Sequence, residues 1–176
     1  MLRAALIAVS IAALAGCAPL PPAVADEHSS TLISSSYRAV DQLVATQSQQ
    51  VFEPGKRVLV ATVVKLNKLN ESSPFGRLLA EHASSRLVQL GGDLTEVKLR
   101  GTLYVSDRQG EMLLSRELRE ITDSHRVDVL LVGTYTETYD RAFVTMKLIR
   151  AQTGQIVSAY NYSLQKNSVV TDLMRD

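Results

Sequence analysis

The apolar residues of the first third of the chain change from helical to extended spacing. Between residues 33 and 51 they recur at steps of three or four residues or multiples of these, which predicts an amphipathic helix of about 16 residues. Its apolar positions are Ile33, Tyr37, Val40, Val44 and Val51. The stretch "EPGK" (53–56) ends this helix. The following "RVLVATVV" (57–64) is β-branched and almost wholly apolar, which is typical of a strand buried on both faces.

A second helix is predicted after the polar loop "KLNKLNESS". Ser73 suits the N-cap and Pro74 the first helical position, and the helix should run to Leu90. Its apolar stripe would consist of Phe75, Leu79, Ala83, Leu87 and Leu90. Gly91 and Gly92 follow, and glycine supplies the left-handed residue with which many helices end.

The middle of the chain reads as short elements. "LTEVKL" (94–99) predicts a strand, and "LYVSDRQGEMLLS" (103–115) predicts a hairpin or an extended loop that turns at "DRQG". Ser115 suits the N-cap of a third, shorter helix, whose Leu118 and Ile121 should point inward.

The last third is extended. "VDVLLVGTYTET" (127–138) predicts a central strand, and two more strands, "FVTMKLIR" and "IVSAYNYSL", follow after short turns. Residues 165–176 show no clear pattern and are expected to be a tail that frays. The order of elements predicts an α/β fold over residues 35–164. We expect a mixed sheet with helices on it, in a two-layer or three-layer-like arrangement, in which βα steps are followed by an antiparallel C-terminal meander.

Residues 1–16 have the order of a secretory signal peptide. Arg3 gives a short positive start, residues 6–14 are apolar apart from Ser10, and small residues follow. The apolar run is too short to span a membrane.

The next residues, "LAGC" (14–17), resemble the lipobox of bacterial lipoproteins. The resemblance implies cleavage between Gly16 and Cys17 and lipid attachment to Cys17, the only cysteine of the chain. The alternative is an ordinary signal peptide cut elsewhere, with Cys17 free. Two or more acyl chains hold a protein stably on a bilayer. Because Ala18 and not Asp follows Cys17, we expect the outer membrane rather than the inner one.

Residues 17–34 are interpreted as the lipidated cysteine and a tether. They contain three of the five prolines and a serine-rich patch, a composition typical of linkers. The alternative is an ordered arm.

Composition narrows the function classes. The 176 residues fit one domain, and with 45% hydrophobic and 21% charged residues a core can form. A formal net charge of +1 argues against a nucleic-acid partner. One cysteine and three histidines exclude a thiolate-rich zinc site, so we expect no metal and no cofactor.

The chain shows no arrangement typical of catalysis. Gly91 and Gly92 stand at a helix end, whereas a phosphate loop needs glycines between a strand and a helix. Ser84 and His82 are two apart and face different ways on a helix. Asp128 on the central strand is interpreted as bonding a loop backbone or marking an edge. We therefore predict no catalytic residue and no enzyme.

The C-terminal strands carry a candidate interaction face. It contains five of the nine aromatic residues: Tyr135, Tyr139, Phe143, Tyr160 and Tyr162. If the helices cover one face of the sheet, part of this set faces outward and suits protein contact, since tyrosine is enriched at interfaces. The alternative is cross-strand pairing that serves the sheet alone.

Three stretches resemble the FlgO family of flagellum-associated outer-membrane lipoproteins. They are "SSPFGRLLAEHASSRLVQLGG", "LYVSDRQGEMLLSREL" and "VDVLLVGTYTETYDRAFVTMKLIRAQTGQIVSA", and the resemblance runs from about Tyr37 to Leu164. It implies a role in forming or stabilising a flagellar ring or sheath at the outer membrane, and it suggests a ring-like homo-oligomer. The layout is more distantly similar to the periplasmic domains of CsgG, of the N-terminal part of TolB and of LpoB-type synthase activators.

The favoured hypothesis is therefore a lipid-anchored outer-membrane protein that binds envelope or flagellar proteins. The alternative is an activator of a peptidoglycan synthase, as LpoB-type proteins are. That role expects a long tether, whereas residues 18–34 span at most about 60 Å when extended. A pore of the CsgG type would need long alternating membrane hairpins, and the hairpins of this chain are short.

Overall fold

The computed structural model describes residues 27–45, 53, 55–95, 104–106, 112–114 and 116–175. Their centre is a six-stranded mixed sheet with the strand order β3-β1-β6-β7-β8 and β2 beside β6. The strands are β1 (Arg57–Val60), β2 (Val64–Lys65), β3 (Asp93–Leu94), β6 (Val129–Glu137), β7 (Arg141–Arg150) and β8 (Ile156–Gln165). β1 runs parallel to β3 and β6, and β6, β7 and β8 form an antiparallel meander. The predicted α/β fold with βα steps and a C-terminal meander is confirmed.

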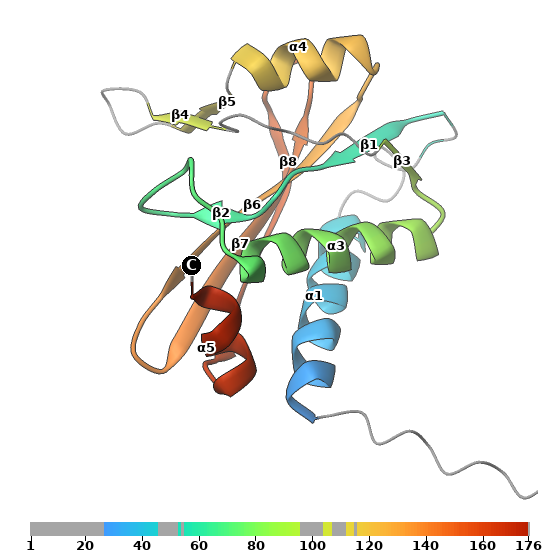
Figure 1. Cartoon of the computed structure of the whole chain (residues 1–176). Helices are drawn as coiled ribbons and strands as arrows, with labels where there is room; N and C mark the ends of the chain where they lie inside the picture. The colour runs from blue at the N-terminus through green and yellow to red at the C-terminus, as the bar shows by residue number, and fades with distance from the viewer. Residues whose placement is uncertain are drawn as a thin grey trace, which may run out of the picture.

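Three helices cover one face of this sheet (Figure 1). They are α1 (Glu27–Ala45), α3 (Pro74–Gln89) and α5 (Ser168–Met174), and their apolar side chains share one core with the strands. The helix α4 (Arg116–Ser124) lies at the opposite end of the molecule from α5, near a separate hairpin of β4 (Tyr104–Ser106) and β5 (Met112–Leu114). The pairing of β4 with β5 confirms the predicted hairpin, while its "DRQG" turn and Ser115 lie outside the described residues.

The connections explain why α4 is separate from the other helices. The chain passes from β1 through α3 to β3 on one side of β1, and later returns through α4 to β6 on the other side. Right-handed crossovers in opposite directions place their helices on opposite faces of a sheet. Accordingly Ile121 of α4 packs on a second, smaller cluster that includes Leu59, Leu130 and Ile149.

The first helix differs from its prediction. It begins at Glu27 and ends at Ala45, so residues 27–34, which we interpreted as part of the tether, are helical. Leu32 and Ser36 are buried against the sheet, and the Ser36 hydroxyl donates to Leu32 O at 2.9 Å. This back-bonding satisfies a buried serine inside a helix, which explains how a serine-rich stretch that reads as a linker can be helical.

The first predicted strand is divided into two. β1 and β2 both pair with β6, but residues 61–63 between them are irregular. The second predicted helix is confirmed as α3, with Ser73 at its N-cap and a left-handed Gly91 (φ +86°) after its end. Leu90 is 40% exposed and does not belong to the buried stripe. Of the predicted strand at 94–99, residue 94 belongs to β3, and residues 96–99 lie outside the described residues.

The predicted C-terminal tail is wrong for residues 168–174, which form α5. Asn167 caps this helix, because its side-chain oxygen accepts from Val170 N–H at 2.9 Å. Val170 and Met174 are buried in the main core. A helix of seven residues with two buried positions is too short to produce a recognisable apolar period.

Candidate interaction surface

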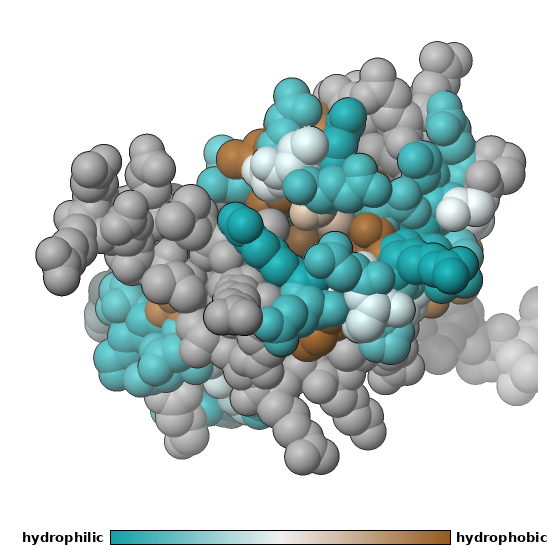
Figure 2. All heavy atoms as spheres, turned by 90° about the horizontal axis from the view of Figure 1, so that it is seen from above, coloured by the Kyte–Doolittle hydropathy of each residue, from teal (hydrophilic) through white to brown (hydrophobic). Residues whose placement is uncertain are grey.

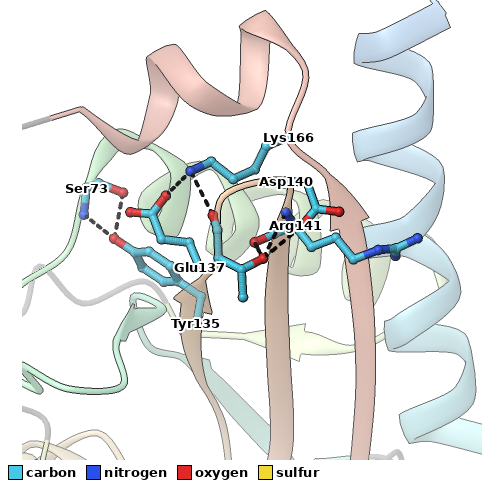
Figure 3. A network of polar contacts seen from close by, with 7 residues as sticks. Ser73, Tyr135, Glu137, Asp140, Arg141 and Lys166 are labelled. Carbon is cyan, nitrogen blue, oxygen red and sulfur yellow. Dashed lines mark hydrogen bonds and ion pairs between the residues drawn. The ribbon is translucent and has the colours of Figure 1, made fainter.

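Tyr135, the first residue of the predicted interaction face, lies inside the core. Its side chain is 2% exposed, and its ring meets the ring of Phe75 edge-on with centroids 5.3 Å apart. Its hydroxyl donates to Ser73 Oγ at 2.7 Å and accepts from the Ser73 N–H at 3.2 Å (Figure 3). These bonds fix the start of α3 to β6, so Tyr135 has a structural role and is not available to a partner.

Gly76 in the first turn of α3 makes this close approach feasible. A Cβ atom at this position would lie 2.0 Å from Val63 O and 2.5 Å from Ser72 Oγ. The Ser72 hydroxyl itself donates to Val63 O at 2.7 Å. The start of α3 and residues 61–63 therefore approach each other through backbone, which requires glycine. Residues 61–63, 72–76 and Tyr135 together form what we call the α3–β6 junction.

The two tyrosines of β8 pack on the helix-covered side of the sheet. Tyr160 and Tyr162 stack with ring centroids 6.4 Å apart, and both contact the main core. Burial raises the pKa of the Tyr162 phenol, and the nearby Ser36 hydroxyl of α1 offsets part of this effect. These rings therefore belong to the core between α1 and β8, and they stack along one strand rather than across two strands.

Phe143 and Tyr139 are the two aromatic residues of the predicted face that remain exposed. The Phe143 side chain lies on β7 and is 43% exposed, and Tyr139, in the turn between β6 and β7, is 99% exposed. The structure therefore does not bring the five aromatic residues together on one face. The β6–β7 register places Phe143 opposite Thr136, on the sheet face that does not carry α1, α3 and α5.

A broader surface surrounds Phe143. Alternate residues of β7, from Ala142 to Leu148, point into the main core, so the residues between them point to the other face. Together with their partners on β8 they form what we call the open β7–β8 face: Arg141, Phe143, Thr145, Lys147, Ala159, Asn161, Ser163 and Gln165. These residues are exposed or partly exposed. This face therefore presents one aromatic ring among small and polar side chains.

The composition of this face gives it a weak charge preference. Arg141 and Lys147 are its charged members, and both are cationic. Arg141 donates to Ser163 Oγ at 2.8 Å, which links β7 to β8 across the face. A partner surface with small apolar and acidic groups would complement this arrangement.

The turn at the end of this face is held by polar contacts (Figure 3). Lys166 forms an ion pair with Glu137 and donates to Thr138 O at 3.2 Å. The Thr138 hydroxyl donates to Asp140 at 3.1 Å. These bonds hold the backbone of the β6–β7 turn, which carries the exposed Tyr139.

The opposite end of the molecule has a different surface. Seen from the α4 end, the described residues are mostly hydrophilic, with hydrophobic residues scattered between them (Figure 2). A pocket beside the start of β6 and the end of β7 is lined by Glu53, Lys56, Asp128, Val129, Arg150 and Gln152. Both signs of charge meet in this pocket, which gives no preference for an anion or a cation.

Two of the polar residues considered for chemistry, Asp128 and Ser84, make structural contacts, whereas His82 Nδ1 is buried without a hydrogen-bond partner. Asp128 accepts from Arg57 N–H at 3.0 Å and from Lys56 Nζ at 3.4 Å, so it bonds a backbone group at the start of β1 and not that of a loop. The Ser84 hydroxyl donates to Ala80 O at 2.9 Å, and burial lowers the pKa of His82 although Glu81 counteracts this. In the part of the chain that the structure describes, no group of three or more His, Cys, Asp or Glu side chains could hold a metal ion. Likewise, none of the described helices is long and apolar enough to cross a membrane.

Comparison with known proteins identifies the family. The model of the family described as "FlgO protein" matches residues 37–169. Among solved structures, the LpoB C-terminal domain from Salmonella enterica superposes with a TM-score of 0.55 at 17% identity, covering 77% of this chain and 98% of that one. The NMR structure of Escherichia coli LpoB gives a TM-score of 0.50 at 13% identity, with 94% and 84% covered. No curated protein matches the chain.

The fold and the family together define an α/β domain with the fold of the LpoB C-terminal domain. The chain belongs to the FlgO family. The predicted resemblance to this family and the distant similarity to LpoB-type domains are both confirmed.

Sequence reasoning missed most of the open β7–β8 face. It selected aromatic residues, whereas Lys147, Ala159, Asn161 and Ser163 belong to the face through their place in the register. The signal that could have found them is the alternation of small polar and large residues in "IVSAYNYSLQ".

Proposed function

We propose that this protein is a non-enzymatic outer-membrane lipoprotein that mediates protein–protein assembly in the cell envelope. Its specific role would be to form or stabilise the outer-membrane ring or sheath of a flagellum, and thereby to support motility. Membership of the FlgO family supports the flagellar part of the proposal. The observation that carries the assembly part is the open β7–β8 face, where Phe143 is 43% exposed among small and polar side chains.

Cys17 would be the membrane anchor, after cleavage between Gly16 and Cys17. The start of α1 at Glu27 limits the distance between this anchor and the domain. Residues 18–26 can span at most about 30 Å even when fully extended. The domain would therefore work close to the membrane that holds it, as a component of an outer-membrane ring must.

Replacing Cys17 with serine is expected to abolish lipid attachment, because the cysteine sulfur is the acceptor of the diacylglyceryl group. Without acyl chains the protein should leave the membrane fraction. Labelling with a radioactive fatty acid and fractionation of the envelope measure both effects. Ala18→Ser, which keeps the cysteine, is the matched control, and labelling of Cys17→Ser at the level of this control would contradict the anchor.

Replacing Phe143 with aspartate is expected to reduce motility strongly while leaving the domain folded. The substitution removes the one aromatic group of the open β7–β8 face and adds a charge there, and exposed positions usually change stability by about 0.5 kcal/mol or less. Motility in soft agar and thermal unfolding of the purified protein are the measurements. Thr153→Asp, at the exposed turn between β7 and β8, is the control and should behave as wild type. A Phe143→Asp protein that unfolds would instead assign Phe143 to packing.

A second candidate function is activation of a peptidoglycan synthase. The observation in its favour is the similarity to the LpoB C-terminal domain from Salmonella enterica, 98% of which is covered. The span available to residues 18–26 argues against it, because an activator must reach from the outer membrane to a synthase beyond the peptidoglycan. Deletion of the gene separates the two: loss of motility and of ring density supports the flagellar role, whereas normal rings with reduced synthase activity support activation.

A further inference from the structure

Among the described residues, the strand β8 lies at an edge of the sheet. It is ten residues long, and within the described part of the chain β7 is its only strand partner. Lys166 N–H donates to Asp140 O at 2.8 Å. This bond shows which alternate residues of β8 direct their backbone N–H and C=O groups towards β7. Backbone groups of alternate residues point towards and away from β7 in an antiparallel pair. Those of Ala159, Asn161 and Ser163 therefore point away from the sheet, and their side chains are exposed.

Within the described structure, residues 158–165 of this edge lack the usual sequence and register features that protect against pairing. Sheet edges are normally protected by charged residues, proline, bulges or a very short strand. The sequence of β8, "IVSAYNYSLQ", contains no charged residue and no proline. The irregularity between Leu148 and Ile149 lies where β8 begins, so residues 158–165 keep a regular register. The nearest cation along the chain, Lys166, is already paired with Glu137.

We infer that β8 pairs with β8 of a second copy of this chain, in the antiparallel register that places Asn161 opposite Asn161 of the other copy. In this register Ala159 lies opposite Ser163, so the residues on the open face are small and uncharged. On the helix-covered face, Tyr160 lies opposite Tyr162, and cross-strand aromatic pairs stabilise sheets. No like charges face each other within the paired strands. The strand is thus complementary to itself, which selects a second copy as its partner.

This pairing has a consequence for the open β7–β8 face. Two antiparallel edge strands are related by a two-fold axis perpendicular to the sheet, so equivalent faces lie on the same side. The two open faces become one continuous surface, with one Phe143 on each side of the axis. The inference extends the proposed function, because pairing would double the area of the open β7–β8 face. Its evidence, however, is the sequence and register of β8.

A cysteine at the centre of the pair tests the register. Cα atoms of a hydrogen-bonded antiparallel pair are about 5.5 Å apart, which is within the range that a disulfide bridges. In the full-length protein carrying Cys17→Ser, Asn161→Cys is the only thiol, because the chain has one native cysteine. Mild oxidation is expected to convert most of it to a covalent dimer. The matched control is Gln165→Cys on the same strand, whose two copies would lie about 26 Å apart and should stay monomeric.

A charge at the same position tests the affinity. Asn161→Lys places two like charges opposite each other, which destabilises a strand pair. We expect a dissociation constant at least tenfold weaker by analytical ultracentrifugation and an unchanged content of β structure, because Asn161 is exposed. A monomeric wild-type protein, equal cross-linking at residues 161 and 165, or cross-linking of residue 161 to a different protein alone would overturn the inference. None of these results would affect the Phe143 experiment, which tests the proposed function separately.

Discussion

Replacing Gly76 with alanine is expected to destabilise the domain by about 3 kcal/mol. The added methyl group would lie 2.0 Å from Val63 O and 2.5 Å from Ser72 Oγ. The first of these is a backbone atom, so it cannot move away by a change of rotamer. The start of α3 must shift instead, and such a shift would break the bonds between Ser73 and Tyr135. Urea unfolding followed by circular dichroism measures the change in the free energy of unfolding.

The expected sign makes this prediction specific. Gly76 lies within α3, and alanine in a helix interior is normally favoured over glycine by about 1 kcal/mol. Helix propensity alone therefore predicts stabilisation, and the α3–β6 junction predicts the opposite. Ser85→Ala, at an exposed position of the same helix, is the control and should be neutral or slightly stabilising. If Gly76→Ala were as stable as wild type, the close approach at the junction would be refuted.

Replacing Tyr135 with alanine is expected to have the largest effect of any single substitution considered, a loss of about 3 to 5 kcal/mol. The mutation removes a buried ring from its contact with Phe75, and it removes the hydroxyl that both donates to and accepts from Ser73. Tyr135→Phe keeps the ring, so it should lose only about 1 to 2 kcal/mol for the hydroxyl. Thermal and denaturant unfolding of both variants separate the ring from the hydroxyl.

Phe143→Ala is the control for the loss of a ring on the same sheet. Because Phe143 is 43% exposed, its removal should cost much less stability than removal of Tyr135. If the Phe143 variant were the less stable of the two, the assignment of Tyr135 to the core and Phe143 to the surface would be reversed.

The contrast between these two residues shows how far the sequence could predict the surface. Residues 129–135 of β6 are buried on both faces of the sheet, so the pattern of this strand does not indicate which side carries the helices. Phe143 lies opposite Thr136 and not opposite Tyr135, which separates the two aromatic residues onto different faces. That separation follows from the register and from the positions of the helices, and neither is contained in the local pattern.

The long elements were predictable because the apolar residues of each recur at a regular spacing. The strands β6, β7 and β8 and the helix α3 were found near their observed positions, since apolar spacing and the turn residues between them agree. The first turns of α1 and all of α5 were missed, because their few buried residues become buried only by docking on β8 and on the main core. The edge position of β8 was also inaccessible, since strand order is a property of the whole sheet.

Imaging of flagellar basal bodies in strains that carry single substitutions tests the central claim most directly. A strain lacking the gene would be complemented with wild type, Phe143→Asp or Thr153→Asp at equal protein abundance, and the outer-membrane ring examined by electron cryotomography. The account predicts normal ring density for wild type and Thr153→Asp, and a lost or strongly weakened ring for Phe143→Asp. Normal rings and motility in the Phe143→Asp strain would contradict assembly through the open β7–β8 face.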